Sequence, residues 1–140
     1  MAKLIFCEDN ESIRKLITIA MRESGHEVLL AEDGVAGLAL VRAERPDLLV
    51  TDLAMPGLDG LQLHDAIRAD PELSALPIVF LTASTQRDLM TNARQRTALA
   101  ILIKPFSPAE LRARLEELLA VSRDRESVGD GKPPGPKDDS

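Results

Sequence analysis

The sequence predicts an α/β fold in which a doubly wound parallel sheet of five strands carries helices on both faces. Short apolar runs alternate five times with longer segments of helical periodicity along the 140 residues. Within these runs apolar and polar residues do not alternate, which is typical of strands buried on both faces of a parallel sheet. Because strand–helix–strand crossovers are right-handed, this order places helices on both faces.

The five expected strands are the short apolar runs. They cover residues 3–7, 27–31, 48–50, 78–82 and 99–103. The third is followed directly by Thr51 and Asp52, so Asp52 stands where a central strand ends. In open parallel sheets, ligands bind outside the carboxyl ends of the strands, which makes this position chemically interesting.

The first two helices follow the first two strands. Asn10 or Glu11 opens the first, and apolar residues at helical spacing then continue along one face as far as Met21. Asp33 leads into a second helix rich in alanine and leucine. Pro46 ends that segment, because proline lacks the backbone N–H that a helix interior requires.

Capping boxes predict where the third and last helices begin. Asp59 stands three residues before a glutamine and predicts a helix over residues 60–69, while Ser107 stands three residues before a glutamate. Proline directly after Ser107 strengthens the second of these starts. The fourth helix is expected to end near residue 96, and it has the thinnest apolar stripe of the five.

Length, charge and cysteine usage indicate a single cytoplasmic domain. A net charge of −6 argues against direct binding to nucleic acids or to an anionic membrane surface. Cys7 is the one cysteine, which excludes an internal disulfide and fits a reducing compartment. Acidic residues follow the first apolar run too early for a signal peptide, and no apolar run is long enough to span a membrane.

The composition changes near residue 123. Beyond it glycine, proline and charged residues dominate, and no apolar periodicity remains. Such a segment buries too little apolar surface to offset its chain entropy. We therefore expect a folded domain over residues 1–122 and a disordered tail or linker remnant over residues 123–140.

Polar side chains stand at the ends of four of the expected strands. They are Glu8 and Asp9, Asp52, Thr82 and Lys104. Because parallel strands bring their carboxyl ends to one edge of the sheet, these side chains should converge. Three carboxylates and one lysine leave a charge of −3 + 1 = −2, and each carboxylate pair at about 4 Å costs roughly 4 kcal/mol. A divalent cation with oxygen ligands, such as Mg²⁺, would balance that charge.

These residues and their neighbours give the chain a family resemblance. The motifs are Glu8-Asp9 after the first strand, Asp52 with Met55-Pro56 and Asp59-Gly60 behind it, Thr82-Ala83, and Lys104-Pro105-Phe106. In this order they resemble the receiver domains of two-component response regulators, over about residues 2–121. The resemblance implies the (βα)5 flavodoxin-like receiver fold.

The resemblance also implies a role for each motif residue. Asp52 would accept a phosphoryl group from a phosphohistidine on a sensor histidine kinase or a histidine phosphotransfer protein, and Thr82 and Lys104 would bind the phosphoryl oxygens. The implied ligands of Mg²⁺ are Glu8, Asp9, Asp52 and the backbone carbonyl of Ala54. Such a protein is no enzyme beyond its own phosphorylation and dephosphorylation. We expect it to bind a downstream protein or output domain through the fourth helix, the fifth strand and the last helix.

Two departures from the family pattern matter. Ile101 stands where family members usually carry tyrosine or phenylalanine, three residues before the lysine. Its β-branched side chain is stiff and too short to swing between pockets, so another element must report phosphorylation. Ala54 and Ser84, which flank the approach of water to Asp52, are both small and uncharged.

Three alternative interpretations remain. The chain could be the receiver piece of a longer regulator whose output domain is absent. It could instead be a magnesium-dependent phosphohydrolase with Asp52 as nucleophile, although Ala54 stands where such enzymes often place a second acid. A nucleotide-binding flavodoxin-like module ranks last, because no glycine-rich phosphate loop follows the first strand.

Overall fold

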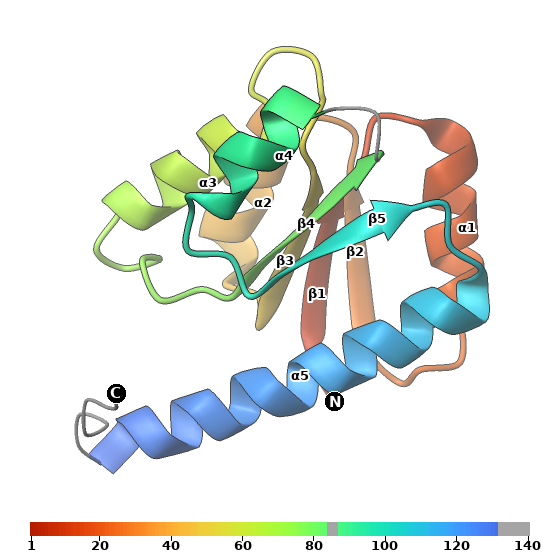
Figure 1. Cartoon of the computed structure of the whole chain (residues 1–140). Coiled ribbons are helices and arrows are strands. Elements are labelled where there is room, and N and C mark those ends of the chain that lie inside the picture. The colour runs from red at the N-terminus through yellow and green to blue at the C-terminus, as the bar shows by residue number, and fades with distance from the viewer. Residues whose placement is uncertain (84–86, 132–140) are drawn as a thin grey trace.

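The computed structural model describes residues 1–83 and 87–131, with side chains described as far as Arg123. Its centre is a parallel sheet with the strand order β2-β1-β3-β4-β5 (Figure 1). The strands are β1 (Lys3–Cys7), β2 (Glu27–Ala31), β3 (Leu48–Asp52), β4 (Ile78–Ala83) and β5 (Ala100–Lys104). The helices are α1 (Glu11–Met21), α2 (Gly34–Glu44), α3 (Gly60–Ala69), α4 (Arg87–Arg94) and α5 (Pro108–Gly131). The predicted five-stranded, doubly wound fold is confirmed.

Two apolar cores lie on opposite faces of the sheet. One is formed with α1 and α5, the other with α2, α3 and α4 (Figure 1). Successive residues of β1 alternate between them: Leu4 and Phe6 face the first core, whereas Ile5 and Cys7 face the second. All four are fully buried. The unbroken apolar runs in the sequence therefore reflect strands that need apolar side chains on both faces.

The helix starts agree with the capping signals. Asp59 caps α3 by accepting from the Gln62 N–H, while the Gln62 side chain accepts from the Asp59 N–H. Ser107 and Glu110 exchange the same reciprocal bonds at the start of α5. Asn10 caps α1 through its side-chain oxygen. These bonds satisfy N–H groups that a helix start leaves without a partner.

Some element boundaries differ slightly from those expected. β5 begins one residue later, at Ala100, and extends to Lys104, which pairs with Ala83 of β4. α4 ends at Arg94 rather than near residue 96. The N–H of Arg96 donates to the Ala93 carbonyl, a three-residue turn that closes the helix.

The last helix extends further than the sequence indicated. α5 continues through Gly131, so the backbone of residues 123–131 is helical where a disordered tail was expected. Loss of the apolar stripe does not end a helix, because an established helix adds one backbone hydrogen bond for each further residue. Residues 132–140, the rest of the expected tail, lie outside the described residues. The domain boundary at residue 122 stays a prediction.

The described helices include none that is long and apolar enough to cross a membrane. The longest, α5, carries charged side chains throughout its length.

A close backbone contact sets the start of α3 against the end of β3. The N–H of Gly60 donates to the Leu53 carbonyl at 2.9 Å. A Cβ atom at Gly60 would lie 2.2 Å from the carbonyl oxygen of Asp52. Only glycine fits here, and the contact fixes the backbone that carries Asp52.

We expect Gly60→Ala to lower the free energy of unfolding by about 1–3 kcal/mol, because the methyl group must push rigid backbone aside. Urea denaturation measures the change. Ala69→Ser, at the exposed end of the same helix, is the control and should change stability by less than about 0.5 kcal/mol. Equal stability of Gly60→Ala and wild type would contradict the contact.

Candidate functional site

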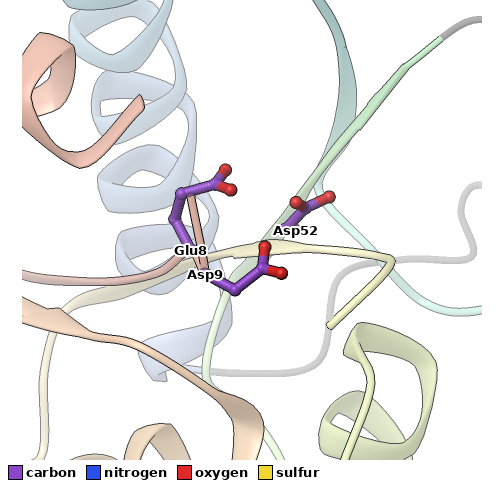
Figure 2. Close-up of side chains that lie close together, drawn as sticks. All are labelled: Glu8, Asp9 and Asp52. Carbon is purple, nitrogen blue, oxygen red and sulfur yellow. The ribbon is translucent and has the colours of Figure 1, made fainter. Parts of the chain in front are cut away.

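The carboxyl edge of the sheet gathers three acidic side chains. Glu8 and Asp9 follow β1, and Asp52 ends β3, the neighbouring strand. Each residue offers one carboxylate oxygen such that the three atoms lie within 4.8 Å of one another (Figure 2). Glu8 and Asp52 are buried, whereas Asp9 is exposed. The predicted convergence of these acids is confirmed.

Lys104 connects the two buried acids. Its Nζ lies 2.9 Å from Glu8 Oε1 and 3.0 Å from Asp52 Oδ2. Burial lowers the pKa of Lys104, but its bonds to both carboxylates outweigh that effect, and its pKa is raised. Lys104 therefore stays charged beside Asp52.

Glu8 is in an unfavourable environment for an ionised carboxylate. Its pKa is raised to about 7. Burial is the largest cause, the contact with Lys104 opposes the shift, and the charge of Asp52 adds to it. The backbone N–H of Asn10 donates to Oε2. Oε1 is buried and is contacted by the Lys104 ammonium at 2.9 Å, an ion pair whose geometry falls short of a full hydrogen bond.

An additional cation would suit this donor set. Three carboxylates supply hard oxygen ligands, and Oε1 of Glu8 retains unused acceptor capacity. Ala54 lines the same surface hollow as Asp9, a space of about 410 Å³ that also reaches Leu89 of α4. The residues present thus fit a divalent metal, although the direction of the Ala54 carbonyl stays a prediction.

Thr82 lies on β4, next to β3, and is fully buried. Its hydroxyl donates to the Ala83 carbonyl at 3.2 Å. Ser84 lies outside the described residues. Ile101 is partly buried and packs against the core formed with α2, α3 and α4.

Arg14 is a contributor that the sequence reasoning missed. From α1 it donates to the Glu8 carbonyl at 2.8 Å, which brings a second positive charge beside the acidic cluster. The only signal in the sequence is an arginine one helical turn beyond the Asn10 cap. Helical spacing alone could not distinguish it from the solvent-facing charges on the same helix.

Comparison with known proteins identifies the family. The model of the response regulator receiver domain matches residues 4–116. The chain belongs to this family. Its fold agrees with that of the chemotaxis response regulator CheY4 of Vibrio cholerae, with a TM-score of 0.77 and 30% identity over 84% of this chain and 98% of that one.

Relatives with curated names differ in length. Protein PilH of Pseudomonas aeruginosa is 32% identical over 86% of this chain and 99% of its own length. The transcriptional regulatory protein PdtaR of Mycobacterium tuberculosis is 40% identical over 89% of this chain, which spans only 58% of that protein. A receiver domain is a signalling module of two-component systems rather than a classical enzyme, so the phosphohydrolase interpretation is not supported.

We expect the raised pKa of Glu8 to make stability depend on pH in the absence of metal. Between its ordinary value of 4.5 and about 7, the folded state holds a proton that the unfolded state has lost. The free energy of unfolding therefore falls as pH rises through this range.

Glu8→Gln removes this titration. Because wild type loses stability as pH rises, the free energy of unfolding of the variant minus that of wild type should be larger at pH 7.5 than at pH 4.5, as measured by urea denaturation in EDTA. Glu23→Gln replaces an exposed glutamate and is the control. If the difference between Glu8→Gln and wild type is the same at both pH values, Glu8 titrates normally.

Proposed function

We propose that this receiver domain accepts a phosphoryl group on Asp52 from the phosphohistidine of a sensor kinase or phosphotransfer protein, and signals by phosphorylation-dependent protein binding. The observation that carries the proposal is the position of Asp52. It lies at the carboxyl end of a central strand, within reach of two further acids and bonded to Lys104. We place the protein in the cytoplasm.

Asp52 needs no activating base, because an ionised carboxylate is already a nucleophile. In the transfer, one Asp52 oxygen forms the bond to phosphorus and the bond to the histidine nitrogen breaks. Lys104 pairs with Glu8 as well as with Asp52, and its ammonium group would bind the phosphoryl oxygens after the transfer. The Thr82 hydroxyl gives up its weak bond to the Ala83 carbonyl in favour of the phosphoryl group.

Mg²⁺ would be held by Glu8, Asp9, Asp52 and the Ala54 carbonyl. When bound, it neutralises charge on the transferring group, which is most of what phosphoryl transfer requires. Phosphorylation adds about −1.5 to −2 charge to a cluster that already carries a net negative charge. The chain's own lysine cannot balance that increase alone.

The output we propose is a protein surface made of α4, β5 and α5. Ile103 of β5 is half-exposed, and the space beside it is lined by Phe106 and Leu111. α4 is the element best suited to move, since only Met90 and Ala93 of its described residues are buried. The partner is either a separate protein or an output domain of the same protein. The first would suit a protein of the length of PilH, and the second a longer one such as PdtaR, of which this chain covers only 58%.

We expect a small-molecule phosphodonor to add one phosphoryl group to the wild-type chain in Mg²⁺ and none in EDTA, as measured by intact-mass spectrometry. Asp52→Asn should remain unmodified in both, because the amide is no nucleophile. Asp88→Asn, an exposed aspartate of α4, is the matched control and should react like wild type. A phosphoryl adduct on Asp52→Asn would show that Asp52 is not the acceptor. An adduct on wild type in EDTA would show that phosphorylation needs no metal.

A further inference from the structure

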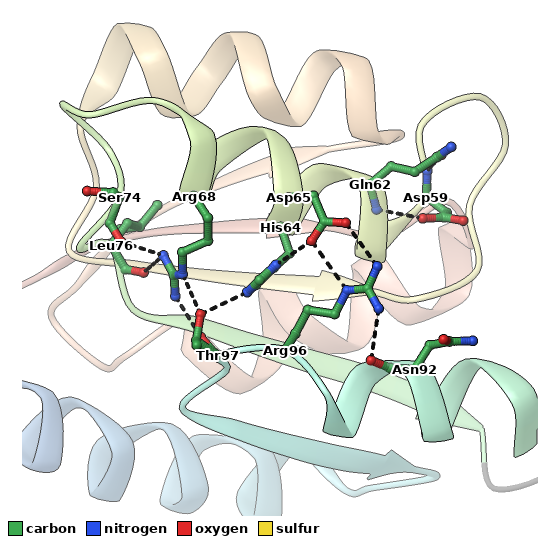
Figure 3. A network of polar contacts seen from close by, with 10 residues as sticks. All are labelled: Asp59, Gln62, His64, Asp65, Arg68, Ser74, Leu76, Asn92, Arg96 and Thr97. Atoms are coloured by element: carbon green, nitrogen blue, oxygen red, sulfur yellow. Dashed lines mark hydrogen bonds and ion pairs between the residues drawn. The ribbon is translucent and has the colours of Figure 1, made fainter.

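The C-terminal end of α4 is attached to the domain by the buried Ala93 and by a group of polar contacts. Of its apolar residues, Met90 and Ala93 are buried and Leu89 is partly buried. Just beyond the helix, Arg96 and Thr97 contact side chains of α3 (Figure 3). Five residues of α3 and of the α4–β5 connection form one connected cluster, which we name the His64 clamp. Its members are His64, Asp65, Arg68, Arg96 and Thr97.

His64 is the centre of the clamp. It is 4% exposed, and its ring lies against Phe80 of β4 with centroids 5.8 Å apart. Nδ1 lies 2.9 Å from Asp65 Oδ1, and Nε2 lies 3.2 Å from the Thr97 hydroxyl. Because a carboxylate only accepts, Nδ1 carries the proton in the neutral ring, and Nε2 accepts from Thr97. Both ring nitrogens are thereby satisfied.

Arg96 joins the clamp to α4. Its guanidinium meets Asp65 through NH2 at 2.9 Å and Nε at 3.3 Å, and its NH1 donates to the Asn92 carbonyl of α4 at 3.1 Å. Arg96 holds the pKa of Asp65 below its usual range, although partial burial acts in the opposite direction. The pair therefore ties the last turn of α4 to α3.

Arg68 secures the other side. Its Nε donates to the Thr97 hydroxyl at 2.8 Å, and its NH2 donates to the Thr97 carbonyl at 2.7 Å. NH1 donates to the carbonyls of Ser74 and Leu76, in the connection that precedes β4. A continuous series of hydrogen bonds therefore runs from the end of α4, through α3, to the connection before β4 (Figure 3).

We propose that the residues of the His64 clamp are positioning residues, which fix the C-terminal end of α4 to α3 and confine any movement of α4 to its N-terminal half. This inference rests on the proposed function only where it concerns phosphorylation. α4 begins at Arg87, four residues after Ala83 ends β4, so a pull from Thr82 reaches the helix at its start. With the far end held, such a pull swings the helix about the clamp.

The clamp also explains how phosphorylation could change the protein surface without an aromatic ring on β5. Ile101 cannot swing between pockets, but a helix that pivots at one end still changes the surface shared with β5. None of the contacts described above joins the clamp to Asp52 or to its acidic neighbours. Changing them should therefore alter the response of α4 and leave the chemistry at Asp52 intact.

The first test uses the unmodified full chain. Arg96→Gln removes the ion pair with Asp65, and amide hydrogen exchange of residues 93–97, followed by NMR, should accelerate by about tenfold, as expected for loss of a charged hydrogen bond. Thr97→Val removes the hydroxyl shared by His64 and Arg68 at an exposed position, and should have the same effect. Arg94→Gln changes an exposed arginine that takes no part in the clamp and should not.

Asp65→Asn shows whether Arg96 acts through Asp65. Its amide oxygen can still accept from His64, but the charge is gone. If the two residues form one unit, the double variant with Arg96→Gln should exchange no faster than either single variant. Additive acceleration, or unchanged exchange in Arg96→Gln and Thr97→Val, would overturn the clamp.

The second test adds beryllofluoride and Mg²⁺, which mimic the phosphoryl group on Asp52. In wild type, chemical-shift changes within α4 should be largest at residues 87–91 and small at 93–97. In Arg96→Gln they should spread through 93–97. Equal changes at both ends of α4 in wild type would overturn the pivot. If beryllofluoride leaves even the neighbours of Asp52 unperturbed, the proposed function fails, and exchange in the unmodified chain alone decides the clamp.

Discussion

The ion pairs of Lys104 with Glu8 and Asp52 are the interaction on which the site depends. Two carboxylates buried a few ångströms apart could not both stay ionised without a neighbouring positive charge. One ammonium group meets both, yet the pKa of Glu8 remains raised. Lys104 thus offsets part of the repulsion between the carboxylates. The cluster still has too little positive charge, which suits it to bind a metal ion.

The scaffold around this cluster is rigid because backbone packs directly on backbone. Gly60 lies against the carbonyl of Asp52, and Gly34 lies equally close to the carbonyl of Leu58 in the loop before α3. A side chain at either position would separate α2, α3 and the end of β3. The backbone at the end of β3, which carries Asp52, is therefore held directly against the start of α3.

α4 has the opposite character. It is short and buries few apolar residues, while its C-terminal end is held by hydrogen bonds that depend on direction rather than on area. In our proposal, this attachment holds the C-terminal end of α4 in place and leaves the rest of the helix able to move. The arrangement we propose thus combines a site at the ends of parallel strands with a helix that responds to it and is attached at one end.

The sequence by itself determined the fold, the helix starts and the edge where the acids meet, because strand periodicity, capping boxes and parallel topology are local or follow from chain order. It also pointed to Asp52 and Lys104, since both stand at strand ends. Only the tertiary structure decided the burial of Glu8, the contact of Arg14 with the Glu8 carbonyl, and the contacts of the His64 clamp. In the clamp, contacts join residues about 30 positions apart, and helical spacing gives no sign of them. The extent of α5 was missed because a helix can continue on backbone hydrogen bonds after its apolar pattern ends.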